Sequence, residues 1–429
     1  MKKQFCLVAA SCLAVTGCVI FPGSAPKAEV PQIRPVDGGI DYYEQFGNSL
    51  PSSPAYFPVA VWMESVIEPG DVVVDQNIGL NTYAGLTSNS DIKQVIDEGS
   101  YAITGWPAPE AAGYMLADEV DMWAGPGSAS WSGQYPGEGD VCDPPAAQCG
   151  FTVQKELLDA APPGALLYTN YGKGVTFWES DAEARRFVND FQDVVSADNY
   201  WFTDPFICGP SEGGAALNGG AELPAQDCRL AKNYGWTVER VRALVDPRGS
   251  KPVWALIEVG HPFQESRGGF IEGPQIRAAV WSSLIHGARG IVYFNHSFGG
   301  DCVSQHVLRE TCGDMVRPWV EAVNRQIKDL APVLNAPFVD DFVSSSQGVD
   351  VAAKLHDGGL YLMAGSTISG PQRVEMKLAC GEAQTAVVIG EGRSVPISNN
   401  TFHDDFADAN AVHLYQLVGG DACGLTGGS

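Results

Sequence analysis

The chain has 429 residues, of which 45% are hydrophobic and 18% charged, and its 51 acidic and 26 basic residues give a formal net charge of -25. This composition is typical of a globular protein and excludes a disordered acidic chain. A negative field of this size repels nucleic acids and polyanionic glycans, so we expect neutral partners and no nucleic acid. The length allows one large domain and a smaller one.

The N-terminal residues predict export. Two lysines precede an apolar run, and the segment from Val15 to Cys18 resembles the lipobox of bacterial lipoproteins. On that resemblance, residues 1–17 are a lipoprotein signal peptide, Cys18 carries the lipid, and residues 18–54 form a tether. The alternative is an ordinary signal peptide in which the cysteine is incidental.

No later stretch of the sequence has the roughly 20 consecutive apolar residues of a membrane-spanning helix. The lipid would therefore be the only attachment to a membrane. We expect an exported monomer anchored at the bacterial cell envelope, on the periplasmic face or at the cell surface.

The cysteines agree with export. Eleven occur in the chain, and an even set remains once the signal peptide and Cys18 are set aside, which suggests disulfides. Pairing of neighbours predicts four bridges, although the spacing leaves other connectivities open. The predicted bridges are Cys142–Cys149, Cys208–Cys228, Cys302–Cys312 and Cys380–Cys423. Because no CxxC or HExxH spacing occurs, we predict no metal site and no cofactor.

A short apolar run that ends in polar or aromatic residues recurs eight times between about Tyr56 and Val333. Each run has the composition of a β-strand. The runs are Tyr56–Trp62, Asn77–Tyr83, Tyr101–Thr104, Tyr114–Ala117, Ala165–Asn170, Val194–Asp198, Pro252–Glu258 and Gly290–Phe294. Helical patterns lie between several of them or follow the last. These are Ser90–Gly99, Thr152–Ala161, Asp181–Val194, Thr237–Val245, Pro274–Ala288 and Met315–Val333.

Strands that alternate with helices indicate a parallel sheet, and eight repeats in this length favour a (β/α)8 barrel over residues 55–334. The first and third helices have little support. A doubly wound sheet is the alternative, but no GxGxxG motif follows a strand.

After Pro332 the pattern changes to short β-rich runs separated by Gly, Asn and Asp turns. This predicts a small antiparallel β-sandwich over residues 335–429. Structural packing against the barrel is the favoured role for it, with ligand binding as the alternative.

The active site of such a barrel lies at the carboxyl ends of its strands, so the residues there are the candidates for chemistry. They are rich in carboxylates and aromatic rings. The predicted catalytic pair is Glu119 and Glu258, at the ends of the fourth and seventh strands. The predicted substrate-binding residues are Trp62, Tyr83, Trp106, Asp118, Trp123, Tyr171, Asp198, Tyr200, Trp201, Asn295 and His296.

Two carboxyls beside a set of Trp and Tyr rings fit glycoside hydrolysis. One carboxyl donates a proton to the leaving oxygen, and the other attacks the anomeric carbon or activates water. Aromatic faces stack on the C–H groups of sugar rings. Asp198, Asn295 and His296 fit a loop-holding role equally well.

Several segments resemble the (β/α)8 glycoside hydrolases of the large retaining clan, clan A. They are "YFPVAVW", "GLNTY", "GYMLADE", "VWALIE" and "AAVWSSLIHGARGIVYFNHSF", and the ending "FADANAVHLYQL" is similar to the β-sandwich often appended to such barrels. The resemblance implies that Glu119 is the acid/base and Glu258 the nucleophile of a retaining enzyme that acts on a neutral oligo- or polysaccharide.

One residue departs from that pattern, because the clan usually has Asn where this chain has Asp118. Adjacent strand residues point to opposite faces, so Asp118 shares the pocket only if the strand end bends. In that case its charge raises the pKa of Glu119. Otherwise Asp118 is a buried, hydrogen-bonded support.

Two other functions were weighed. Gly209–Gly213 matches the GxSxG pattern of esterases, but a loop follows it where that motif needs a helix. A carbohydrate-binding surface lipoprotein without catalysis is the main alternative to the hydrolase. The sugar, its linkage and endo or exo cleavage are not encoded in any motif.

Overall fold

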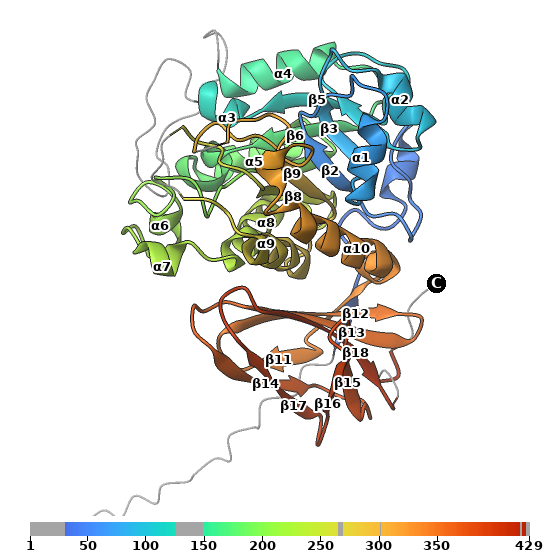
Figure 1. Ribbon diagram of the computed structural model, residues 1–429, viewed down its shortest axis with the longest axis vertical. Helices are drawn as coiled ribbons and strands as arrows, with labels where there is room; N and C mark the ends of the chain where they lie inside the picture. The colour runs from blue at the N-terminus through green and yellow to red at the C-terminus, as the bar shows by residue number, and fades with distance from the viewer. Residues whose placement is uncertain (1–30, 126–148, 265–268, 301, 421–422, 426–429) are drawn as a thin grey trace, which may run out of the picture.

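The computed structural model describes residues 31–125, 149–264, 269–300, 302–420 and 423–425. Eight parallel strands with surrounding helices form one part of the molecule, and antiparallel sheets form the other, lower part in Figure 1. Within the described residues, no helix is long and apolar enough to cross a membrane. Cys18 and the signal-like segment lie outside the described residues.

The eight parallel strands close into a barrel, because the last strand pairs with the first. This confirms the predicted (β/α)8 fold. The strands are β2 Val59–Trp62, β3 Thr82–Leu86, β4 Tyr101–Thr104, β5 Gly113–Asp118, β6 Leu167–Tyr171, β7 Val194–Ala197, β8 Val253–Glu258 and β9 Ile291–Phe294.

The crossovers carry helices except between β4 and β5, where residues 105–112 form a loop. The longer helices are α4 Gly150–Ala160, α5 Asp181–Asp190, α8 Lys232–Leu244, α9 Gly273–Ile285 and α10 Arg317–Leu334. The shorter ones are η1 Tyr42–Gln45, α1 Asp71–Asn77, α2 Ile92–Asp97, α3 Val120–Trp123, the π-helix η2 Gly174–Trp178, α6 Gly213–Leu217, α7 Ala225–Cys228 and η3 Thr311–Gly313. Helix α9 is apolar on most sides because it packs against both the barrel and the sandwich.

Side chains alternate between the barrel interior and the helical layer. On β8, Trp254 and Leu256 belong to the interior cluster with Trp62, whereas Ala255 and Ile257 pack toward the helices. The wide aromatic rings fill the barrel axis, so the interior is a packed core and the open space is confined to the strand ends.

The second strand begins later than its apolar pattern predicts. Asn77 ends α1, Gly79 follows with a φ of 82°, and β3 starts only at Thr82. Tyr83 therefore lies near the start of the strand and faces the helical layer, where its hydroxyl donates to Asp75 at 2.6 Å. Tyr83 was predicted to line the substrate site, but in this structure it does not reach the pocket at the strand ends.

The C-terminal region forms two antiparallel sheets, ordered β1-β10-β12-β13-β18-β15-β16 and β11-β14-β17, around a shared apolar core. The strands are β1 Gln32–Arg34, β10 Phe338–Asp340, β11 Val343–Ser345, β12 Val349–His356, β13 Gly359–Ser366, β14 Gln372–Leu378, β15 Thr385–Val388, β16 Arg393–Pro396, β17 Thr401–Phe406 and β18 Val412–Val418. The predicted antiparallel β region is thus present.

Part of the expected tether is an ordered element. Strand β1 pairs with β10 at the edge of the larger sheet. Farther along, Asp37 is buried in an ion pair with Arg242 of α8, and Tyr43 packs in the barrel interior cluster. The chain before β2 therefore connects both parts of the molecule.

Three of the predicted disulfides are present: Cys208–Cys228, Cys302–Cys312 and Cys380–Cys423. The first two close loops that follow barrel strands, and the third links the C-terminal segment to the strand region before it. Cys142, of the predicted Cys142–Cys149 bridge, lies outside the described residues.

Candidate active site

A pocket of about 370 Å³ opens at the carboxyl ends of the barrel strands. Its walls combine carboxylates, aromatic rings and one lysine. The lining residues are Trp62, Met63, Asp118, Glu119, Met122, Lys173, Asp198, Tyr200, Pro262, Phe263, Phe294, His296 and Phe298. Six of the predicted site residues are brought together here: Trp62, Asp118, Glu119, Asp198, Tyr200 and His296.

Both acids of the "ADE" motif reach the pocket because the chain turns at the end of β5. Glu119 has a φ of 50° and a ψ of 30°, a left-handed conformation that is uncommon for a residue with a side chain. The turn is held by Asp121, whose carboxylate accepts from the backbone N of Val175 at 2.8 Å and of Gly172 at 3.0 Å. The end of strand β5 is therefore bent, so Asp118 shares the pocket with Glu119.

Glu119 and Asp198 line the same pocket, and the charge of Glu119 acts on Asp198. Two neighbouring carboxyls resist joint ionisation, because a like charge disfavours the charged form. Burial, followed by the charge of Glu119, raises the pKa of Asp198 well above its usual range. Burial, followed by the charge of Asp118, raises the pKa of Glu119 to about 7. The raised pKa of each acid favours retention of a proton on this pair.

Asp118 completes the acidic cluster. Burial, and then the charge of Asp198, raises its pKa to about 7, while a hydrogen bond from Asn170 Nδ2 at 3.0 Å opposes that rise. Asn170 is fully buried at the end of β6 and in turn accepts from Ser196 Oγ at 2.6 Å. These contacts fix the orientation of the Asp118 carboxylate.

Lys173 supplies the positive charge of the pocket wall. Its Nζ lies 2.6 Å from Asp204 Oδ2 and 2.8 Å from Glu212 Oε2, and both acids are buried. Its charge also lowers the pKa of Glu119, although burial and Asp118 outweigh this effect. Because two carboxylates already neutralise Lys173, the pocket as a whole is acidic and favours a neutral or cationic ligand.

Aromatic rings form another part of the pocket lining. Tyr200 packs against Phe294 with ring centroids 5.0 Å apart and against Phe263 at 5.7 Å, and its hydroxyl donates to Asp198 Oδ2 at 2.7 Å. Phe298 is 38% exposed and continues this surface toward solvent. Rings of this kind suit the apolar faces of a sugar.

His296 lies beside these rings and is buried. Burial lowers its pKa, while a hydrogen bond to the backbone of Met63 opposes that shift. Met63 has a φ of 45°, so a second left-handed residue occurs at the pocket wall. The imidazole is therefore neutral at pH 7.

The remaining predicted site residues lie elsewhere. Trp123 is 58% exposed, just beyond the rim, and donates to the Asp118 carbonyl at 2.9 Å. Trp106 donates to the Leu86 carbonyl at 3.3 Å and does not line the pocket. Both residues contact the chain near the site without facing its cavity.

Two buried aromatics and one amide have structural partners instead. Tyr171 donates behind β6 to the Phe187 carbonyl, and Trp201 donates to Thr237 of α8. Asn295 donates to the buried carboxylate of Glu64 and accepts from the backbone N of Leu308, so it holds the loop after β9. Tyr171, Trp201 and Asn295 therefore do not line the pocket in this structure, and their polar atoms bond to other parts of the barrel.

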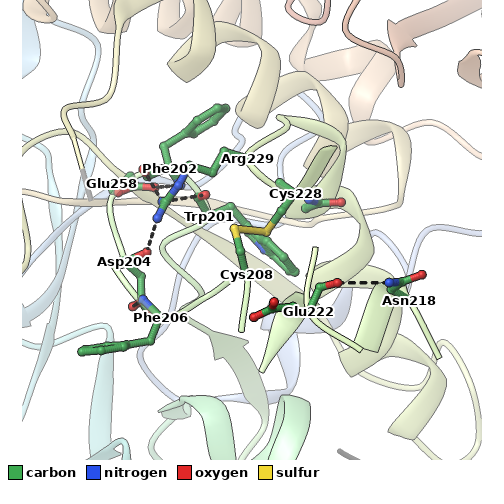
Figure 2. Close-up of a disulfide and its surroundings, with 11 residues drawn as sticks. Trp201, Phe202, Asp204, Phe206, Cys208, Asn218, Glu222, Cys228, Arg229 and Glu258 are labelled. Carbon is green, nitrogen blue, oxygen red and sulfur yellow. Dashed lines mark hydrogen bonds between the residues drawn. A yellow bond between two sulfur atoms is a disulfide. The ribbon is translucent and has the colours of Figure 1, made fainter. Parts of the chain in front are cut away.

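Glu258 is also absent from the pocket wall. It is completely buried, and its carboxylate accepts hydrogen bonds from the Phe202 backbone and from the hydroxyls of Thr203 and Tyr234 (Figure 2 shows Glu258 beside Phe202). Burial raises its pKa to about 7, and these bonds oppose the rise. The carboxylate turns toward the loop after β7 because its donors lie there.

The structure adds pocket residues that the sequence prediction lacked: Met63, Met122, Lys173, Pro262, Phe263, Phe294 and Phe298. Phe294 ends β9, so the rule that examines strand ends could have found it. The others belong to loops or short helical turns, where no periodicity indicates side-chain direction.

No known family model and no curated protein matches this sequence. Among solved structures, an α-amylase from Anoxybacillus has a TM-score of 0.43 and 9% identity, covering 85% of this chain and 98% of its own. A family 39 glycoside hydrolase from Bacteroides cellulosilyticus has a TM-score of 0.47 and 11% identity, covering 85% and 82%. A maltogenic α-amylase from Thermotoga neapolitana has a TM-score of 0.46 and 7% identity, covering 85% and 99%. These likenesses are distant, and the function of this chain is inferred below from its own residues.

Proposed function

We propose that this protein is a glycoside hydrolase that cleaves a neutral oligo- or polysaccharide in the pocket at the carboxyl ends of the barrel strands. The observation that carries this proposal is the cluster of three carboxyls, Asp118, Glu119 and Asp198, with raised pKa values in a pocket lined by aromatic rings. A retained proton next to an ionisable carboxylate is the combination that acid-catalysed glycoside cleavage needs.

The first step uses the shared proton. Glu119 delivers it to the glycosidic oxygen while the bond between that oxygen and the anomeric carbon breaks, and Asp198 is the partner that keeps the pair protonated. Asp118, in its ionised form, supplies the negative charge that stabilises the cationic anomeric carbon. Water then adds its hydroxyl to that carbon and returns a proton to the pair, so the site is restored.

Asp118 takes the place that the sequence suggested for Glu258. The Glu258 oxygens are occupied by three donors away from the pocket, whereas Asp118 lines the pocket and its charge acts on Glu119. Retention of configuration is proposed from the resemblance of the sequence to the retaining clan, and product analysis tests it.

Hydrolysis of a panel of neutral glycans by the purified chain tests the proposal. We expect sugar release from at least one glycan, with lower rates for Asp118→Asn and Asp198→Asn. Proton NMR of the first product formed should show the anomeric configuration of the substrate. If the unaltered chain binds a glycan without cleaving it, the protein is a carbohydrate-binding lipoprotein and the hydrolase proposal fails.

We also propose that the chain is exported and anchored at the cell envelope through lipid on Cys18. The signal-like N-terminus and the three disulfides of the described residues support this location. Mass spectrometry of the mature N-terminus tests it. We expect a diacylglyceryl-modified Cys18 as the first residue, and an unmodified Met1 would contradict the proposal.

A further inference from the structure

Glu258 ties the segment after β7 to the barrel wall. Its Oε1 accepts from the Phe202 backbone N at 2.9 Å, and its two oxygens also accept from the hydroxyls of Thr203 and Tyr234. Phe202 and Thr203 belong to the loop that follows β7, and Tyr234 belongs to α8. A fully buried carboxylate that accepts three hydrogen bonds is fixed in position, and it also fixes the positions of its donors.

Arg229 donates hydrogen bonds to backbone carbonyls of the same loop. Its Nη1 donates to the Phe202 carbonyl at 2.6 Å, and its Nη2 donates to the Asp204 carbonyl at 2.7 Å (Figure 2). The preceding residue, Cys228, is bonded to Cys208. The disulfide therefore anchors the backbone from which the guanidinium reaches the loop.

Glu258 and Arg229 both form hydrogen bonds with the backbone of Phe202. Its backbone N–H donates to Glu258, and its carbonyl accepts from Arg229. An acidic and a basic side chain thus hold the two polar groups of one residue, and each bond involves an ionisable partner. Charge-assisted bonds are stronger than neutral ones, so the position of the loop depends on both side chains.

The clamped loop carries two pocket residues on one side of Phe202 and, on the other, a partner of the pocket residue Lys173. Asp198 and Tyr200 precede Phe202, and Asp204 follows it. Asp198 lines the pocket together with Glu119, and Asp204 Oδ2 lies 2.6 Å from Lys173 Nζ. A shift of this loop would therefore change both the shared proton and the position of the lysine.

We infer that Glu258 and Arg229 are positioning residues, which clamp residues 201–204 and so hold Asp198 against Glu119 and Asp204 against Lys173. The catalytic consequence rests on the proposed function, but the clamp itself does not. Neither side chain needs to touch the substrate for this role.

Hydrogen exchange of backbone amides tests the clamp without any substrate. In the full-length chain, Glu258→Gln and Arg229→Gln should speed exchange within residues 199–206 by roughly tenfold, while Arg229→Lys should restore part of the protection. If Glu258→Gln does not fold, Tyr234→Phe is the test variant in its place, because it removes a single hydrogen-bond donor to Glu258. The double variant Cys380→Ser/Cys423→Ser is the matched control, because it removes a disulfide of the C-terminal sheets and should leave this loop unchanged.

Kinetics separate positioning from nucleophilic attack. Misplacement of Asp198 should lower kcat of Glu258→Gln by up to about 100-fold with little change in KM, and should alter the alkaline limb of the pH profile. Added azide should not restore turnover to Glu258→Ala. A nucleophile variant would instead give a glycosyl azide of inverted configuration.

Two results would overturn the clamp: azide rescue of Glu258→Ala, or unchanged exchange of residues 199–206 in both Glu258→Gln and Arg229→Gln. If the unaltered chain cleaves no glycan but exchange in the loop responds as expected, the proposed hydrolase fails while the clamp stands.

Discussion

Glu119, which follows the fourth barrel strand, lines the same pocket as Asp198, which follows the sixth, and the charge of Glu119 raises the pKa of Asp198. The left-handed turn at Glu119 and the clamped loop after β7 place the two carboxyls in this pocket. Their retained proton is a property of the folded chain, because two isolated acids would both be ionised at neutral pH.

Replacing Glu119 by Gln should lower kcat by about 10²–10⁴, because the group that delivers the proton is lost. The loss should be smallest for aryl glycosides with good leaving groups, which need little protonation. Steady-state kinetics on both substrate types check this. Glu156→Gln, an exposed acid of α4, is the control and should behave as the unaltered chain. Equal losses on both substrate types would contradict the acid role.

Replacing Asp118 by Asn should lower the pKa of Glu119 from about 7, because the charge of Asp118 is the largest contribution after burial that raises it. The chemical shifts of carboxyl carbons in a ¹³C NMR titration report this pKa directly, so the test does not depend on turnover. An unchanged pKa of Glu119 would mean that Asp118 lies too far from it to act.

Phe298→Ala should raise KM by roughly tenfold with little effect on kcat, because one stacked ring contributes about 0.5–1.5 kcal/mol to binding. Initial-rate measurements over a range of substrate concentrations separate the effect on KM from the effect on kcat. Phe206→Ala is the matched control, since Phe206 is 56% exposed but does not line the pocket. Equal effects of the two substitutions would contradict a specific stacking role.

The free energy of unfolding should fall as pH rises from about 5 to 8. Burial raises the pKa of Glu258 and of Asp121 to about 7, so the folded chain binds protons that the unfolded chain has already released. The stability from each group is fully present below its unfolded pKa and is lost as pH rises through about 7. For Glu258 the loss is on the order of 3 kcal/mol at roughly 1.4 kcal/mol per pKa unit.

Urea denaturation at several pH values measures this trend. Glu258→Gln, which has no titrating proton, should reduce the dependence between pH 5 and 8. Stability that rises over the same interval in the unaltered chain would contradict the raised pKa values.

The barrel could be predicted because its strands follow one simple rule, in which an apolar run ends in polar residues at a shared edge. Strands β1, β10 and β11 have no predictive pattern because each has only three residues. Strand β17 has no clean pattern because the buried Asp404 interrupts its apolar alternation, and only the pairing of Asp404 with Arg393 explains that burial.

Part of the site could be predicted because some of its residues also lie at strand ends. The position of Asp118 and Glu119 at a strand end is encoded in the sequence, but the left-handed turn that directs both into the pocket is not. The direction of the Glu258 side chain depends on donors from Thr203 and Tyr234, which lie 55 and 24 residues away along the chain. Contacts over such distances leave no local pattern.

The most direct test of the central claim is sugar release from a panel of neutral glycans by the unaltered chain and by Glu119→Gln, measured side by side. We expect release by the unaltered chain and a rate about 10²–10⁴ lower for the variant on the same glycan. Release at equal rates by both proteins, or no release from any glycan by the unaltered chain, would contradict it.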